Sequence, residues 1–316
     1  MNITKVFLVI LSKVLSLFFR SRTIRHILSL TNDEKKEFLV KIINENQKYI
    51  EQEKQESTSN NSFKFVQNYN QLPCTIETRK KRADLLEKNG FRDKQILLMG
   101  DDDLLSVELA ARNFKHVTVL DCDHSLLNKL KILTNEVKYP INYFHIDLYH
   151  GIPNYLNNLF DVVCFDPPQN SKDLNIFIES ALKAIKYNDS RLYMMINTSA
   201  LGQKNFNNIS DIISAKGFNA TNKFEFFNCY PLNKGQSLLL SFVSRFLNGK
   251  MNSNKYVNCK YYFTDCYEFK YSNEKDLAEV ENNNPMPSSS DNSALYLTEY
   301  PTPSYSNARA QNNIIK

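Results

Sequence analysis

The sequence predicts an α/β domain with a mostly parallel sheet, because short apolar runs alternate with helical stretches over residues 63–245. The chain has 316 residues, 42% of them hydrophobic and 23% charged, a composition close to that of soluble globular proteins. Glycine is scarce and no internal repeat is visible, which excludes collagen-like and blade-repeat architectures. The length suits about two domains, or one domain with long extensions.

The expected sheet has seven strands, the last two of which are joined without a helix. The strands are predicted at 95–99, 116–120, 141–145, 161–165, 191–196, 223–227 and 237–243. Helices are predicted between them at 104–113, 124–137, 172–187 and 206–216. This inventory is typical of a Rossmann-like, class I methyltransferase-type domain, in which ligands bind at the carboxyl ends of the strands.

The regions on either side of this domain are predicted to differ from it. Residues 1–62 hold an amphipathic helix at 3–19, a second helix at about 34–55 and a polar linker. Residues 246–271 include a tyrosine-rich stretch that is compatible with one or two extra strands. Residues 272–316 are rich in Asn, Ser and Pro, as in a disordered tail.

The net charge of +5 comes from one end of the chain. Residues 1–30 carry five basic residues and no acidic residue, so the remainder is close to neutral. The sheet region has no basic stripe with interleaved aromatic residues, which argues against nucleic-acid binding. The basic segment 3–19 either makes a peripheral membrane contact or folds its apolar face onto the domain, and the sequence leaves both open.

The cysteines indicate a reducing compartment. The six cysteines form no C-x-x-C pair, and three of them lie within or beside apolar runs, as free thiols of cytoplasmic proteins do. We therefore expect a cytoplasmic protein without a metal site. The sequence is also compatible with a homodimer.

Acidic residues follow the first four predicted strands, at the edge where a ligand is expected. Gly100 and three consecutive aspartates, Asp101 to Asp103, come directly after the first strand. Adjacent carboxylates repel one another and raise one another's pKa, a cost that a purely structural turn has no reason to carry. A cationic ligand would offset this repulsion, although Asp101 alone would serve as an ordinary helix cap.

The next two strands are followed by candidate contacts for a nucleoside. Asp121 lies 21 positions after Gly100, at the end of the second strand, where an acidic residue can hydrogen-bond ribose hydroxyls. Asp147 follows the third strand, on the side where an adenine is usually held. A solvent-facing aspartate in a turn remains the alternative for both positions.

The fourth strand is followed by Asp166-Pro167-Pro168-Gln169. The prolines fix the backbone so that the carboxylate and a following carbonyl can accept hydrogen bonds from an attacking amine. In adenine N6 methyltransferases an aromatic residue at the fourth position stacks on the base. Gln169 offers no such ring, which favours an aliphatic amine.

The segment from Gln71 to Arg82 precedes the first strand. Thr75 or Thr78 is expected to cap a helix there, with its Lys and Arg residues on the solvated face. The segment is also placed to fold over the cofactor loop as a lid, in which Gln71 and Glu77 would face the site.

Three blocks of the chain resemble the branched-chain polyamine synthases, also called N4-bis(aminopropyl)spermidine synthases. They are a Q-x-P-x-T-x-E-T-x-x-x-R pattern at 71–82, GDDDLLS at 100–106 and FDVVCFDPP at 160–168. The resemblance covers about residues 69–245. It implies transfer of an aminopropyl group from decarboxylated S-adenosylmethionine to an amine of a polyamine such as spermidine, with release of methylthioadenosine.

The resemblance also implies roles for individual residues. Asp102 would orient and deprotonate the attacking amine and Asp166 would hold it, while the aspartate triplet attracts the ammonium of the decarboxylated co-substrate. The expected co-substrate contacts are Gly100, Asp101, Asp103, Asp121 and Asp147, and the expected acceptor contacts are Gln71, Glu77, Pro167 and Gln169. Two alternatives remain: an S-adenosylmethionine-dependent methyltransferase acting on a small amine, and a non-catalytic adaptor held at a membrane.

Overall fold

The computed structural model describes residues 40–50, 73–168, 171–238, 240–241 and 259–272. The predicted helix at 3–19 and nearly all of the predicted tail lie outside these residues. No helix within the described ranges is long and apolar enough to cross a membrane.

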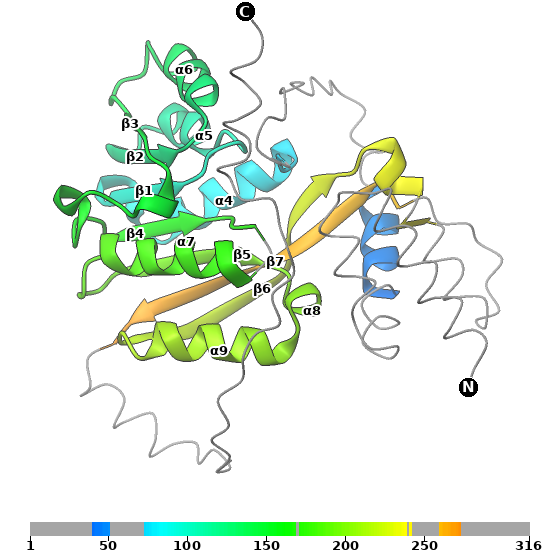
Figure 1. The fold of residues 1–316 in the computed structure, drawn as a ribbon. Coiled ribbons are helices and arrows are strands. Elements are labelled where there is room, and N and C mark those ends of the chain that lie inside the picture. Colours follow the sequence, from blue (N-terminus) through cyan, green and yellow to red (C-terminus); the bar gives the residue numbers. More distant parts are fainter. Residues whose placement is uncertain (1–39, 51–72, 169–170, 239, 242–258, 273–316) are drawn as a thin grey trace, which may run out of the picture.

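Seven strands form one sheet, as the sequence predicts (Figure 1). The order across the sheet is β3-β2-β1-β4-β5-β7-β6, in which β1 to β5 run parallel and β7 is antiparallel to both of its neighbours. The strands are β1 (Gln95–Met99), β2 (His116–Asp121), β3 (Asn142–His145), β4 (Val162–Phe165), β5 (Arg191–Ile196), β6 (Phe218–Pro231) and β7 (Tyr261–Tyr271).

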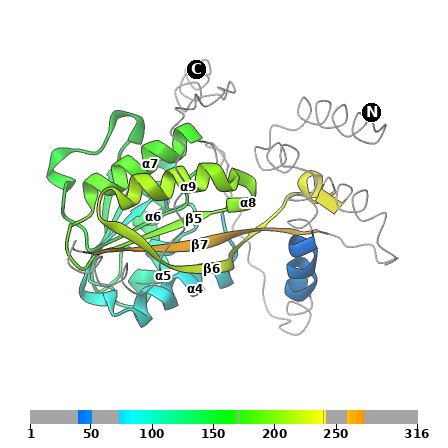
Figure 2. The same cartoon turned by 90° about the horizontal axis from the view of Figure 1, so that it is seen from below.

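Helices cover both faces of the sheet (Figure 2). They are α4 (Ile76–Lys88), α5 (Leu105–Ala111), α6 (His124–Leu133), α7 (Ser171–Ala184), α8 (Thr198–Leu201) and α9 (Gln203–Ser214), with single 3₁₀ turns η1 (Phe91–Asp93), η2 (Leu148–His150) and η3 (Asn154–Leu156). Alternate residues of β1 point to opposite faces. Ile96 and Leu98 therefore join the core under α4, α5 and α6, whereas Leu97 and Met99 join the core under α7 and α9.

The predicted strand at 237–243 is wrong. Residues 234–238 and 240–241 are helical, and the last strand of the sheet is β7. A short apolar run fits a buried helix as well as a strand, so periodicity could not separate the two. The expected domain end at residue 245 falls between β6 and β7, which are neighbours in the same sheet.

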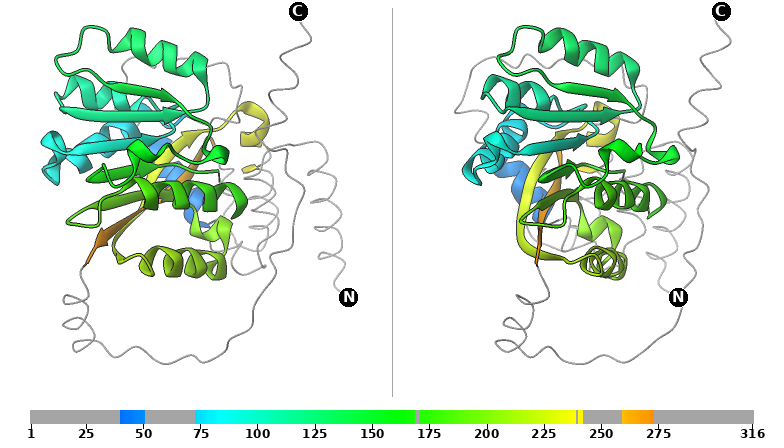
Figure 3. Two further views of the ribbon diagram at one scale, coloured as in Figure 1. Left: turned by 60° about the vertical axis from the view of Figure 1, so that its left-hand side comes forward. Right: turned by 90° about the vertical axis from the view of Figure 1, so that its left-hand side faces the viewer.

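The helix at residues 40–50 packs beside one end of β7 (Figure 3). The amide of Asn46 donates to the Tyr261 carbonyl at 3.0 Å, and its carbonyl oxygen accepts the Tyr261 amide at 2.9 Å. The ring of Tyr49 lies against that of Tyr261, with 4.8 Å between centroids, and the Tyr49 hydroxyl donates to Thr75 at 2.9 Å. This helix thereby connects β7 to the segment that begins α4.

Candidate active site

The loop between β1 and α5 bends sharply at both of its ends. Gly100 has a φ of +83° and Leu104 a φ of +59°, so each lies in the left-handed region, which is unusual for leucine. A positive φ strains the backbone at Leu104 but not at Gly100. Strain of this kind persists only where the surrounding structure enforces it, and it is concentrated at functional sites. The loop carries the three aspartates at the carboxyl end of β1.

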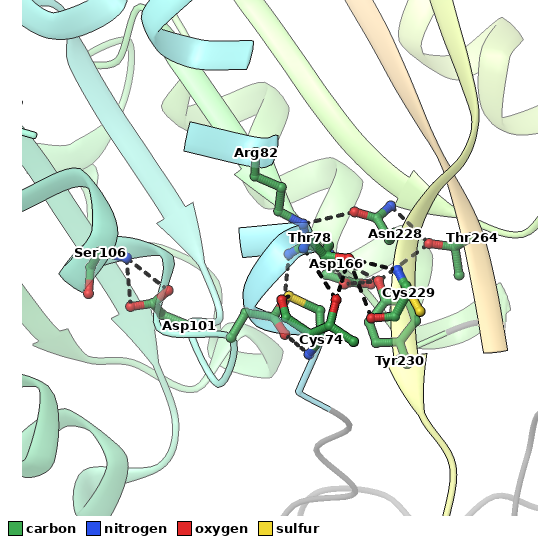
Figure 4. Close-up of polar contacts among 12 residues, drawn as sticks. Cys74, Thr78, Arg82, Asp101, Ser106, Asp166, Asn228, Cys229, Tyr230 and Thr264 are labelled. Carbon is green, nitrogen blue, oxygen red and sulfur yellow. Dashed lines mark hydrogen bonds and ion pairs between the residues drawn. The ribbon is translucent and has the colours of Figure 1, made fainter. Parts of the chain in front are cut away.

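Asp101 belongs to the framework of this loop. Its carboxylate accepts the backbone amide of Ser106 in the first turn of α5, at 3.2 Å from each oxygen (Figure 4). Its own amide donates to Asp121 Oδ2 at 3.2 Å. Asp101 is 2% exposed, and its carboxylate caps the first turn of α5 by accepting the Ser106 amide.

Asp121 ends β2 and supports two turns. Its carboxylate accepts the amide of Asp123 at 2.7 Å in addition to that of Asp101, and burial raises the pKa of Asp121 to about 6. Asp147 follows β3, where its carboxylate caps η2 by accepting the Tyr149 amide at 3.0 Å. Both residues lie at the strand ends where the nucleoside was expected.

Asp103 is paired. Its Oδ2 accepts Arg82 Nη1 at 2.5 Å, and its Oδ1 accepts the backbone amide of Cys74 just before α4. The pair with Arg82 is buried, with both side chains 5% exposed. A buried carboxylate needs such partners, because its desolvation would otherwise cost several kcal/mol.

Asp166, at the carboxyl end of β4, shares the same guanidinium. Its Oδ2 accepts Arg82 Nη2 at 2.7 Å and the Tyr230 hydroxyl at 2.5 Å. Burial raises the pKa of Asp166, while Arg82 and the hydrogen bond from Tyr230 oppose the rise. Asp103 and Asp166 therefore both bind Arg82.

Asp102 differs from its two neighbours. Its side chain is half-buried, and no residue in the described ranges forms a hydrogen bond or ion pair with its carboxylate. Burial, reinforced by the charges of Asp103 and Asp166, raises the pKa of Asp102 well above its ordinary value. Among the three consecutive aspartates, Asp102 is the one whose carboxylate has no partner within the described residues.

The predicted acceptor contacts are only partly assembled by the described residues. Pro167 is buried directly after Asp166. Glu77 lies on the exposed side of the first turn of α4, where it accepts the Tyr49 hydroxyl at 3.0 Å. Gln71 and Gln169 lie outside the described residues. Thr75 caps α4, as expected, by accepting the Thr78 amide at 3.3 Å.

Three residues of this cluster were not predicted from the sequence as site residues, namely Arg82, Asn228 and Tyr230. Arg82 was expected on the solvated face of its helix, yet its side chain is 5% exposed. A signal was present, because Thr78 and Arg82 are four residues apart and so share a face of α4 with Ala83 and Leu86. No comparable signal marked Asn228 and Tyr230 on β6.

The arrangement suits a cationic ligand. Arg82 pairs with Asp103 and Asp166, and Asp102 lies near both of these carboxylates, so two negative charges remain in excess when all three carboxylates are ionised. A carboxylate whose pKa is raised is a stronger base toward the proton of an amine than an ordinary carboxylate. Within the described residues, no group of three or more His, Cys, Asp or Glu side chains is arranged to hold a metal ion.

Comparison with known proteins agrees with the resemblance seen in the sequence blocks. The family model described as "Branched-chain polyamine synthase A C-terminal domain" matches residues 42–290. The N(4)-bis(aminopropyl)spermidine synthases of Thermococcus kodakarensis and Methanocaldococcus jannaschii are each 31% identical to the chain over 121 residues. Each match covers 37% of this chain and about a third of the relative, 34% and 35% respectively.

A solved structure has the same fold. It is the branched-chain polyamine synthase of Thermus thermophilus in complex with N4-aminopropylspermidine and 5'-methylthioadenosine, with a TM-score of 0.55 and 19% identity. The similarity covers 72% of this chain and 63% of the other. Since the family model matches most of its length, this chain belongs to the family of the branched-chain polyamine synthase A C-terminal domain.

Proposed function

We propose that the chain is an aminopropyltransferase that moves the aminopropyl group of decarboxylated S-adenosylmethionine to an amine of a polyamine such as spermidine. The observation that carries the proposal is Asp102, a half-buried carboxylate without a partner among the described residues, whose pKa is raised by burial and by the charges of Asp103 and Asp166. Family membership supports the same reaction. Two relatives are N(4)-bis(aminopropyl)spermidine synthases, and the Thermus thermophilus structure contains an aminopropylated spermidine and methylthioadenosine.

In the proposed reaction the acceptor nitrogen attacks the propyl carbon next to the sulfonium. The new N–C bond forms as the C–S bond breaks, the electron pair of that bond returns to sulfur, and neutral methylthioadenosine leaves. Asp102 takes the proton from the acceptor nitrogen, and Asp166 accepts a second hydrogen bond from it. Alignment of the two reactants supplies most of the acceleration, because the sulfonium is already an activated leaving group.

The remaining predicted residues have supporting roles in the proposal. Asp121 would bind the ribose hydroxyls and Asp147 would lie on the adenine side. Gly100 permits the close approach of the loop to the nucleoside, and Asp101 and Asp103 would hold this loop next to the ammonium. The predicted acceptor contacts, Gln71, Glu77, Pro167 and Gln169, would line the approach to Asp166. The co-substrate is decarboxylated, so it lacks the carboxylate that this acidic site would repel.

The first experiment measures binding by calorimetry. Decarboxylated S-adenosylmethionine should bind at least about tenfold more tightly than S-adenosylmethionine, a difference of about 1.4 kcal/mol, with methylthioadenosine as the nucleoside control. Equal or tighter binding of the parent compound would contradict aminopropyl transfer and favour methyl transfer. If neither sulfonium compound bound, the enzymatic proposal would fail.

The second experiment tests Asp102 in a turnover assay. Asp102→Asn should lower the release of methylthioadenosine in the presence of spermidine by about 10²- to 10⁴-fold, because the amide cannot accept the proton. The matched control is Asp161→Asn, which changes a partly buried aspartate immediately before β4, at the opposite end of that strand from Asp166. Full activity in the folded Asp102→Asn variant would refute the role of Asp102.

A further inference from the structure

Arg82 is held so that each part of its guanidinium has a different partner. Nη1 donates to Asp103 at 2.5 Å, Nη2 to Asp166 at 2.7 Å, and Nε to the Asn228 side-chain carbonyl at 2.9 Å. The Asn228 amide in turn donates to Thr264 Oγ1 on β7 at 3.0 Å. A planar guanidinium with this set of partners can neither rotate nor withdraw without losing several charge-assisted hydrogen bonds.

Tyr230 reaches the same carboxylate from β6. Its hydroxyl donates to Asp166 Oδ2 at 2.5 Å and lies 3.0 Å from Arg82 Nη2 (Figure 4). The Tyr230 side chain is 4% exposed, and its ring packs against that of Tyr262 with 6.3 Å between centroids. The hydroxyl position is therefore fixed by packing as well as by hydrogen bonds.

Both donors contact the same oxygen of Asp166. Arg82 and Tyr230 each bind Oδ2, and no hydrogen bond among the described residues reaches Oδ1. A carboxylate fixed through one oxygen keeps the lone pairs of the other in a defined direction. Oδ1 is then the atom of Asp166 that an incoming amine can use.

We propose that Arg82 and Tyr230 are positioning residues that fix Oδ2 of Asp166 and thereby present Oδ1 to the acceptor amine. This inference rests on the proposed function for the identity of the amine. The network also separates two roles within the acidic cluster. Arg82 neutralises Asp103 and orients Asp166, while Asp102 remains unpaired within the described residues to receive the proton.

The variant that tests this is Tyr230→Phe, which keeps the ring and removes the hydroxyl. We expect the KM for spermidine to rise about tenfold while the KM for decarboxylated S-adenosylmethionine changes less than about twofold, because only the amine-binding carboxylate loses its orientation. The lost hydrogen bond should also raise the pKa of Asp166, which carboxyl-carbon NMR titration of selectively labelled protein measures.

Tyr193→Phe is the matched control. Tyr193 is likewise buried and donates to a carboxylate, that of Glu268 at 2.9 Å, but the side-chain partners of Glu268 in the described part of the chain are Arg191, Tyr193 and Asn222, none of which binds Arg82 or Asp166 there. Both variants should lose a similar amount of stability, and only Tyr230→Phe should change the kinetics for spermidine. Equal spermidine KM values in Tyr230→Phe and wild type, with an unchanged Asp166 titration, would overturn the inference.

Arg82→Lys provides a second test that keeps the positive charge. One ammonium cannot bind Asp103, Asp166 and Asn228 with the geometry of the guanidinium, so the KM for spermidine should rise here as well. A variant with wild-type KM would overturn the role of Arg82. If the wild-type chain released no methylthioadenosine with any amine, the proposed function would fail, whereas the Asp166 titration in Tyr230→Phe would still decide the inference.

Discussion

The three aspartates after β1 have the same chemistry and different surroundings. Asp101 accepts a helix amide, Asp103 pairs with Arg82, and Asp102 has no partner among the described residues. The repulsion expected from three adjacent carboxylates is thus relieved at two positions by groups of the chain itself. We infer that the negative charge left for a ligand is concentrated at Asp102 and at the free oxygen of Asp166.

The burial of Asp101 predicts how the free energy of unfolding changes with pH. Burial raises the pKa of Asp101 to about 7, although the Ser106 amide opposes the rise. The folded state therefore retains a proton that the unfolded chain loses near pH 4. The stabilisation from this group is complete below about pH 4 and is lost as the pH rises to about 7. Relative to Asp101→Asn, the wild-type free energy of unfolding should fall across this window by at most about 1.4 kcal/mol per pH unit.

Urea unfolding of both proteins at several pH values between 4.5 and 7.5 measures this difference. Asp161→Asn is the control. Burial acts to raise the pKa of Asp161, but Lys186 and the Gln95 amide outweigh it and hold the pKa below its ordinary value. Its contribution should therefore change only below about pH 4, and its curve should run parallel to that of the wild type. A parallel curve for Asp101→Asn would contradict the prediction.

Among the helices and strands, the sequence predicted those whose apolar periodicity is distinct. Strands β1 to β5 and the helices between them lie within a few residues of their predicted ranges, because each has a distinct apolar pattern. The acidic residues predicted at the carboxyl ends of β1 to β4 lie there in the structure. The insertion of β7 between β5 and β6 depends on long-range pairing, which a local pattern does not contain.

Side-chain burial limited the prediction of the site in a similar way. Arg82 was part of a recognised motif, but a charged residue on a polar helix is usually solvated. Its burial follows from partners contributed by distant elements, Asp166 from β4 and Asn228 and Tyr230 from β6. A cluster of carboxylates predicts that a cation lies nearby, and in the structure Arg82 of α4 is that cation.

The contact between the helix at 40–50 and β7 should contribute to the stability of the fold. Asn46 is fully buried and satisfies both backbone groups of Tyr261, at the first residue of β7. Asn46→Ala would remove both of these buried hydrogen bonds and should lower the free energy of unfolding by about 1–3 kcal/mol. Thermal and urea unfolding measure the loss.

Lys48→Ala on the same helix is the control. It removes only a solvated pair with Glu45 and should change the free energy of unfolding by less than about 1 kcal/mol. Equal effects of the two variants would show that Asn46 does not join the helix to β7.

At the scale of the whole molecule, the distribution of charge separates two parts of the chain. The five basic residues of positions 1–30 account for the net charge of +5, while the acidic cluster follows β1 and β4 in the nearly neutral remainder of the chain. The family model begins at residue 42, after this basic segment. Catalysis and any membrane contact should therefore be separable by deletion.

Deletion of residues 1–30 should abolish binding to vesicles that contain phosphatidylserine and leave the release of methylthioadenosine unchanged. The apolar side of segment 3–19 and its basic residues would both contribute to such binding, and added salt should weaken the electrostatic part. Co-sedimentation with and without the anionic lipid measures it. A full-length variant with Arg20, Arg22 and Arg25 changed to Gln is the matched control, since it retains the apolar side and should bind less than wild type but more than the deletion. An insoluble deletion product would instead show that the segment packs against the domain, because removal would then expose an apolar surface of the core.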